Sequence, residues 1–174
     1  MFWLKIIRDF IKILRAGQTP NQIAVAFALG AIVGLSPSFT LQGILVWLII
    51  LVLDVNLSAA LLSFTLFSLF AYLLDPLFHR LGYSLLVNVE AIKGMWTTLY
   101  NAPIAPLTRF NNTVVLGSFI SALILFFPIH VGMKRFVVAY RSHVGARMEK
   151  WKIYQTINRS ALIRWYTKIR DLGR

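Results

Sequence analysis

The sequence contains no cysteine among its 174 residues and only six acidic residues. The absence of cysteine excludes disulfide bonds, thiol catalysis and thiolate metal sites, and it says nothing about the redox compartment. Charged residues of both signs make up 14% of the chain, whereas soluble domains carry about 25%. In contrast, 58% of the residues are hydrophobic and the mean hydropathy is +0.71. A water-soluble chain of this length has no way to bury so much apolar surface, so the composition predicts an integral membrane protein.

The excess of basic charge, a net +12, is concentrated at the two ends of the chain. Residues 1–16 hold four basic residues against one acid, and residues 134–174 hold eleven against two. The three basic and three acidic residues between these ends cancel. Basic ends that flank long uncharged apolar runs follow the positive-inside pattern, so we expect both termini in the cytoplasm. A nucleic-acid partner, the usual alternative for a basic protein, is not expected.

Four apolar segments predict an all-α membrane domain over residues 17–133. They cover residues 22–35, 41–53, 57–74 and 112–133. A straight span needs about 20 residues, and the second segment has only 13, which rise roughly 20 Å. The first two segments are therefore either short or tilted spans, or the two arms of a re-entrant hairpin. We favour four crossings, and either alternative leaves both termini on the same side.

Amphipathic helices are predicted at both ends of the chain and in its longest loop. Residues 1–16 place a basic face opposite a Trp and Phe face, which suits a membrane interface. An apolar stripe predicts a second such helix over residues 76–100, capped by Asp75 and lying flat on the opposite surface.

The basic tail, residues 134–174, is expected to form a cytoplasmic amphipathic segment with aromatic stripes. Juxtamembrane basic side chains are attracted to anionic lipid. A role in topology alone is an equal alternative for the tail. The side chains expected to contact lipid headgroups are Lys5, Arg8, Lys12, Arg15, Arg141, Arg147, Lys150 and Lys152.

Small residues follow one face of the first apolar segment, where Ala26, Gly30 and Gly34 fall at i, i+4 and i+8. In lipid, helices associate through close van der Waals contact, which small residues permit. We therefore predict a helix-packing face, within this fold or in a dimer. The functional alternative is a helix that slides, or that lets a ligand approach its backbone.

The stretch from Ser36 to Gln42 predicts a break between the first two apolar segments. Pro37 lacks an N–H and disfavours a helical Ser36, while Ser38 or Thr40 can cap a new helix. A helix N-terminus in a membrane cavity can hold an anion, and transporters use broken helices in this way. The candidate ligand site is therefore Ser36, Pro37, Ser38, Thr40 and Gln42, with an ordinary capped turn as the structural alternative.

The sequence holds no recognisable enzyme motif. It lacks a nucleophile elbow, a phosphate-binding glycine loop and a His–carboxylate cluster with metal spacing. We therefore expect no catalytic residues, no metal site and no cofactor. Asp54, between the second and third segments, is expected to act as a helix cap and turn former.

Several short motifs, in a fairly specific order, resemble the bacterial domain of unknown function 2062 family over roughly residues 19–128. The family often has an Asn-Pro pair after the third segment, and here Asp75-Pro76 is the nearest equivalent. The motifs are Pro20-Asn21-Gln22-Ile23-Ala24, Ala28-Leu29-Gly30, Gly34-Leu35-Ser36-Pro37, Leu41-Gln42 and Asn56-Leu57-Ser58-Ala59-Ala60.

The resemblance implies a small polytopic protein of the bacterial inner membrane, and the family has no established activity or catalytic residue to carry over. Some relatives are fused to sugar- or methyl-transferring domains. The subgroup that this chain resembles tends to be encoded beside a large envelope protein, with an AsmA-like lipid-bridge protein as the implied partner. We therefore expect a non-enzymatic accessory or anchoring module in envelope or lipid processes. The alternative is a small transporter or flippase-like conduit with a broken-helix site around Ser36 to Gln42.

Overall fold

The computed structural model describes residues 18–37 and 39–142. This part of the chain is helical and holds no strand, which confirms the predicted all-α class. The chain divides into two compact units, Met1–Val137 and Val138–Arg174, and the packing described below belongs to the first. The helices predicted over residues 1–16 and in the tail beyond residue 142 lie outside the described residues.

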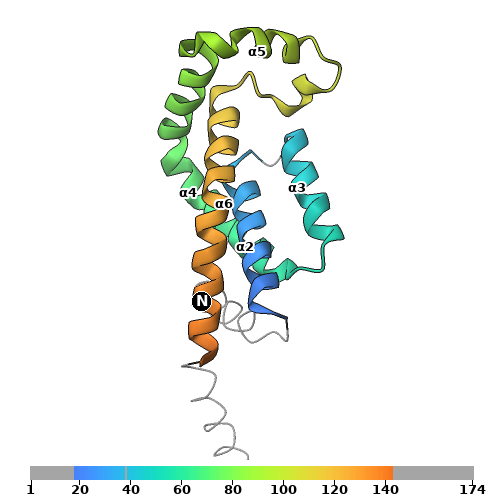
Figure 1. The fold of residues 1–174 in the computed structure, drawn as a ribbon, viewed down its shortest axis with the longest axis vertical. Helices are drawn as coiled ribbons and strands as arrows, with labels where there is room; N and C mark the ends of the chain where they lie inside the picture. Colours follow the sequence, from blue (N-terminus) through green and yellow to red (C-terminus); the bar gives the residue numbers. More distant parts are fainter. Residues whose placement is uncertain (1–17, 38, 143–174) are drawn as a thin grey trace, which may run out of the picture. The chain divides into compact units, whose positions relative to one another are not determined.

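Four longer helices carry the fold, and short helical turns join the last two of them (Figure 1). The predicted boundary at residue 133 lies inside the last long helix. The long helices are α2 (Pro20–Leu35), α3 (Leu41–Val52), α4 (Leu57–Tyr83) and α6 (Thr113–Tyr140), and the connecting turns are η1 (Ser84–Asn88), η2 (Glu90–Ile92), α5 (Lys93–Tyr100) and η3 (Ala105–Thr108).

Local hydrogen bonds explain where α2 and α3 begin. Thr19 and Gln22 form a capping box at the start of α2: the Gln22 backbone N–H donates to Thr19 Oγ1 at 3.2 Å, and the Thr19 N–H donates to Gln22 Oε1 at 2.9 Å. The Thr40 hydroxyl accepts from the Gly43 N–H at 3.3 Å and caps α3. Between them, Pro37 follows the end of α2 and has no N–H with which to continue it.

The cap of α4 is Asn56, whose Oδ1 accepts the Ala59 N–H at 2.8 Å. The prediction that Asp54 provides a cap was therefore wrong. Asp54 lies in the turn before it and accepts two hydrogen bonds from Gln22 Nε2, one at its carbonyl oxygen (2.9 Å) and one at Oδ2 (3.0 Å). This interaction ties the start of α2 to the turn between α3 and α4.

Helix α4 runs through Pro76, so the predicted helix end at residue 74 and the Asp75 cap were wrong. A proline inside a helix removes one backbone hydrogen bond, and neighbouring helices make this loss tolerable in apolar surroundings. The break comes instead at Val89, whose backbone is extended (φ −90°, ψ 93°). The helix predicted over residues 76–100 is thus divided between the end of α4 with η1, and η2 with α5. Helix α6 likewise continues past Pro128.

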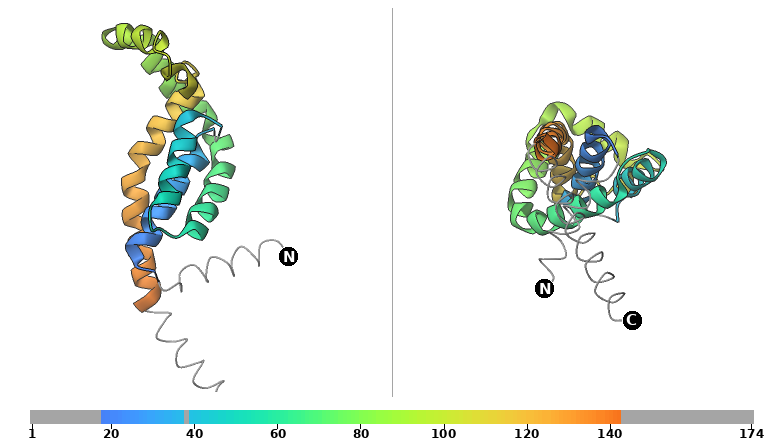
Figure 2. Two further views of the ribbon diagram at one scale, coloured as in Figure 1. Left: turned by 90° about the vertical axis from the view of Figure 1, so that its right-hand side faces the viewer. Right: turned by 90° about the horizontal axis from the view of Figure 1, so that it is seen from below.

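Helix α2 is the buried element of the fold. Eleven of its 16 residues are buried, and Figure 2 shows it between α3 and α6 with α4 on a third side. The other long helices turn large apolar side chains outward. The most exposed of these, on α3, α4 and α6, are Leu51, Val52, Leu69, Tyr72, Leu73, Leu77, Ile124 and Phe127. A helix that is apolar all round needs such surrounding elements to cover it.

The small-residue face of α2 lies against α4. A Cβ atom added to Gly30 would overlap the Ala60 carbonyl, and one added to Gly34 would lie 2.7 Å from the Phe64 carbonyl oxygen. In the same interface the Ser63 hydroxyl donates to the Phe27 carbonyl oxygen at 2.5 Å. Two polar groups are thereby paired at a point where the two backbones nearly touch.

A second close contact joins α4 to α6. A Cβ atom on Gly82 would overlap the backbone of Thr113, and one on Gly117 would overlap the Phe78 carbonyl. His79 Nδ1 and Thr113 Oγ1 lie 2.7 Å apart at the same crossing. The two glycines therefore set how closely these long helices approach each other.

Among the described residues, two helical stretches are long and apolar enough to cross a membrane, Leu57–Asn88 and Thr113–Tyr140. Only 17% and 28% of their most apolar 18-residue windows are buried, respectively. Helices α2 and α3 are shorter, so length supports two of the four predicted crossings and does not confirm the other two.

We predict that Gly30→Ala destabilises the fold by about 1–3 kcal/mol, the usual cost of overpacking, because the added methyl meets a backbone carbonyl that has little room to move. Gly132→Ala on α6 is the matched control, since a Cβ atom there meets nothing within 4 Å. Replacing a mid-helix glycine by alanine is otherwise favourable by about 0.5–1 kcal/mol. Thermal unfolding in detergent should therefore show opposite signs for the two variants. A Gly30→Ala protein as stable as the Gly132→Ala protein would contradict the contact.

Candidate functional site

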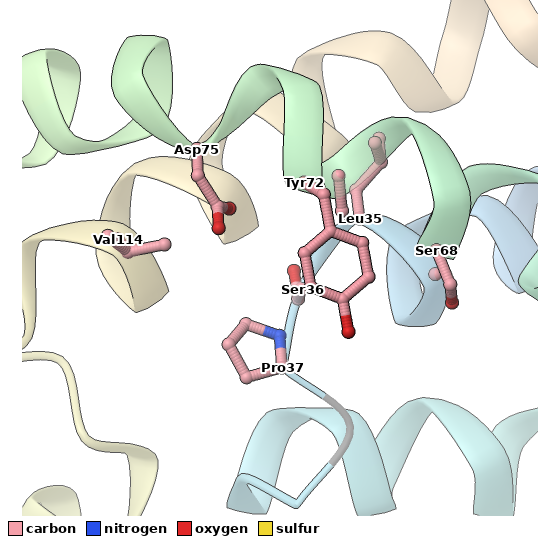
Figure 3. Close-up of a pocket in the computed structure, with 9 residues that line it drawn as sticks. Leu35, Ser36, Pro37, Ser68, Tyr72, Asp75 and Val114 are labelled. Carbon is pink, nitrogen blue, oxygen red and sulfur yellow. The ribbon is translucent and has the colours of Figure 1, made fainter.

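A cavity of 310 Å³ lies where α2 stops and α4 continues. Helix α2 ends just before Pro37, whereas α4 continues through Pro76. The first turn of α6 lies beside both helices, and the cavity is the space between the three elements. Its lining comes from these three elements (Figure 3). The residues are Gly34, Leu35, Ser36 and Pro37 at the end of α2, Ser68, Ala71, Tyr72 and Asp75 on α4, and Val114 on α6.

Oxygen atoms dominate the polar lining of this cavity. In Figure 3 the Asp75 carboxylate and the Ser36 hydroxyl point into the space beside the Tyr72 ring. Ser36 is 5% exposed and its Oγ has no hydrogen-bond partner. Within residues 18–37 and 39–142, the Asp75 carboxylate makes no hydrogen bond and no salt bridge. The lining includes no Lys, Arg or His.

The structure brings two of the five predicted site residues, Ser36 and Pro37, to this cavity. Thr40 is buried and does not line it; its hydroxyl donates to the Pro37 carbonyl oxygen at 3.0 Å and caps α3. Gln42 is also absent from the lining, and its Oε1 is buried without a partner. Ser38 lies outside the described residues.

Sequence reasoning missed the contribution of α4. Ser68, Tyr72 and Asp75 fall at i, i+4 and i+7, so they share one face of the helix. That spacing was visible in the sequence as a polar stripe on an apolar segment. A helix that ends at residue 74 with Asp75 as the next cap leaves this carboxylate outside the stripe, whereas α4 continues through it.

The predicted packing residues Ala26, Gly30 and Gly34 are all buried, and the two glycines face α4. Of the residues expected to contact lipid headgroups, Arg141 is within the described part of the chain, just after α6. The others, Lys5, Arg8, Lys12, Arg15, Arg147, Lys150 and Lys152, lie outside it.

At the start of α2, the end opposite the cavity, polar side chains contact neighbouring elements. Besides the Gln22–Asp54 interaction, Asn21 Oδ1 lies 3.1 Å from His130 Nε2 on α6. The start of α2 is therefore level with the turn before α4 and with a point on α6 one helical turn before Lys134. No group of three acidic or histidine side chains with metal-binding geometry occurs in the described ranges.

A second cavity, of 470 Å³ and mainly apolar lining, lies between the end of α4, α5 and the start of α6. Trp96 closes one side: its indole N–H donates to the Leu85 carbonyl oxygen at 3.0 Å, and its ring stacks on Phe110 with centroids 5.5 Å apart. Trp96 is thus partly turned toward the protein, whereas Tyr100 is exposed.

These features define an all-helical protein with an apolar outer surface and a buried, small-residue helix, an arrangement that indicates membrane association. A family model described as "Uncharacterized protein conserved in bacteria (DUF2062)" matches residues 5–144, and the chain belongs to this family. The predicted resemblance is thereby confirmed. An "Uncharacterized protein" of Treponema pallidum (strain Nichols) is 23% identical over 159 residues, which cover 91% of this chain and 98% of the relative. No solved structure matches the chain.

Proposed function

We propose that this chain is a non-enzymatic, multi-pass protein of the bacterial inner membrane that anchors or assists an envelope partner. Its basic ends lie in the cytoplasm and contact anionic lipid. The observation that carries this proposal is the outward orientation of the large apolar side chains on α3, α4 and α6. Soluble monomers rarely expose contiguous apolar patches of more than a few hundred Å², so side chains of this number and size favour lipid as their surroundings.

The positions of both ends of α2 support four crossings. Asn21, at its start, contacts His130 on α6, close to the first basic residue that follows, Lys134. Ser36, at its end, shares a cavity with Val114 in the first turn of α6. Helix α2 therefore reaches along nearly the whole apolar length of α6.

The short length of α2 is compatible with a crossing. Its 16 residues rise about 24 Å at 1.5 Å per residue, and the hydrocarbon core is about 30 Å thick. A mismatch of this size is accommodated by local thinning of the bilayer. Pro37 and Phe39, in the turn after Leu35, are exposed, which is compatible with a turn at the membrane surface.

The identity of the partner rests on the family resemblance, which implies a large AsmA-like envelope protein. A second candidate function, a small transporter or flippase-like conduit, is favoured by one observation. The cavity at the end of α2 places polar groups at a helix break beside two long apolar helices.

Because the chain has no cysteine, single-cysteine variants test the topology directly. Phe39, which is 89% exposed in the turn between α2 and α3, and Asn101, after α5, should lie outside the cytoplasm. We predict that Phe39→Cys and Asn101→Cys react with a membrane-impermeant maleimide on intact spheroplasts. Asp54→Cys, at the opposite end of the helices, should react only after lysis.

Labelling of Asn101→Cys only after lysis would contradict the paired crossing of α4 and α6. Labelling of Asn101→Cys but not of Phe39→Cys on intact spheroplasts would contradict the crossing of α2 and α3 and would leave the re-entrant hairpin. Each variant should first be shown to reach the membrane fraction in normal amount.

The basic tail supplies the lipid contact in this proposal. Each Lys or Arg near an anionic surface contributes about 1 kcal/mol, so Arg147→Glu, Lys150→Glu and Lys152→Glu together should sharply weaken binding of the isolated 143–174 peptide to phosphatidylglycerol vesicles. The control is a peptide with the same three residues changed between Lys and Arg, which keeps the charge. Equal binding by both peptides in a vesicle sedimentation assay would leave the tail as a topology signal only.

A further inference from the structure

We infer that the cavity at the end of α2 is a binding site for a primary ammonium group, held by the Asp75 carboxylate and the Ser36 hydroxyl. The inference goes beyond the proposed function and is compatible with either the anchoring module or the conduit. It concerns a site that combines residues from α2 and α4, within a chain whose overall charge is strongly positive.

The charge of the cavity selects a cation. Asp75 is its one ionisable carboxylate, and no basic side chain lines it to neutralise that charge. Ionisable groups inside a membrane domain are costly and usually serve a ligand or a partner charge. Within the described part of the chain, the Asp75 carboxylate contacts no basic side chain, so it is available to a positively charged ligand.

The backbone at the cavity adds further negative potential. The C-terminal end of a helix carries a partial negative charge, and Gly34 and Leu35 of the last turn of α2 line the cavity. Pro37 has no N–H to donate to the Val33 carbonyl, and Pro76 has none to donate to the Tyr72 carbonyl. Both prolines therefore reduce the number of backbone N–H donors near the cavity, where carbonyl, carboxylate and hydroxyl oxygens can accept hydrogen bonds.

Ser36 provides an independent observation. It is 95% buried, its Oγ has no partner, and the atom points into the cavity beside Tyr72 (Figure 3). A buried polar atom without a hydrogen bond is costly, so such atoms are rare in folded proteins. An N–H of a bound ammonium group would pair with this oxygen, and a quaternary ammonium would not.

The size of the cavity favours an organic amine over a bare metal ion. Its 310 Å³ falls at the lower end of the range for small-molecule pockets, about 300–1,000 Å³. A primary ammonium has three N–H donors, which match a carboxylate, a hydroxyl and a backbone carbonyl. The Tyr72 ring beside them can add a cation–π contact. The amine can belong to a free small molecule or to an aminoethyl lipid headgroup.

The test uses the full-length protein in nanodiscs of phosphatidylcholine, which has no primary amine. Thermal unfolding is measured with increasing ethylammonium chloride or with NaCl at equal ionic strength. We expect ethylammonium to raise Tm by several degrees more than NaCl does. The excess should disappear in Asp75→Asn. Asp54→Asn, which changes a carboxylate at the opposite end of α2, should respond like the unmodified protein.

Ser36→Ala keeps the test decisive if Asp75→Asn folds poorly. Its Oγ is buried without a partner, so removing it should leave the Tm without amine no lower than that of the unmodified protein, and the response to ethylammonium should be reduced. An equal Tm rise with ethylammonium and NaCl, or an undiminished excess in Ser36→Ala and Asp75→Asn, would overturn the inference.

A second arm separates the two sources of the amine. If a lipid headgroup is the ligand, nanodiscs that contain phosphatidylethanolamine should raise Tm in the unmodified protein but not in Asp75→Asn, and ethylammonium should then add little. If a free amine is the ligand, phosphatidylethanolamine should have no effect and ethylammonium should still act. A Tm that follows phosphatidylethanolamine equally in both proteins would contradict a role for Asp75. None of these readings depends on the labelling experiment, so topology and ligand can fail separately.

Discussion

The fold depends on the contact between the backbones of α2 and α4. At Gly30 and Gly34 the two helices approach so closely that a single methyl group would meet a main-chain carbonyl of α4. Apolar burial contributes little to helix association in lipid, so this close packing, with the Ser63–Phe27 hydrogen bond, is what holds the central helix in place. The large apolar side chains of α3, α4 and α6 are not needed for this contact, and many of them face outward. The contact face between α2 and α4 is therefore built from small residues, while the outer faces carry large apolar ones.

The candidate site follows from this packing and from two prolines with different effects. Pro37 stands where α2 ends, whereas Pro76 is carried inside α4. Because one helix stops beside another that continues, a cavity with several polar side chains forms at the end of α2. The Gly82 and Gly117 contacts hold α6 against α4 next to it. Among the described residues, the unpaired Asp75 carboxylate and the unpaired, buried Ser36 hydroxyl both line this cavity, and together they favour a positively charged ligand.

Periodicity and composition predicted the all-α class, and the apolar segments matched α2 and α3 closely, because caps and proline act locally. The break at Ser36 to Thr40 was predictable for the same reason. The path of α4 was not, since a proline inside a helix is tolerated only when neighbouring elements support it, and sequence spacing does not reveal those neighbours. The Asp75 assignment failed with it. That Ser36 and Asp75 line the same cavity could not be predicted, because it depends on α2 ending beside α4, which is tertiary information.

The central claim is that hydrocarbon, not water, surrounds the outward faces of these helices. The most direct measurement is the size distribution and circular dichroism of the purified full-length chain, in detergent and after detergent removal without lipid. We predict a monodisperse helical protein in detergent and aggregation once detergent is withdrawn. A monodisperse, helical product in detergent-free buffer would contradict the account, because the apolar faces would then be stable in water without lipid or detergent.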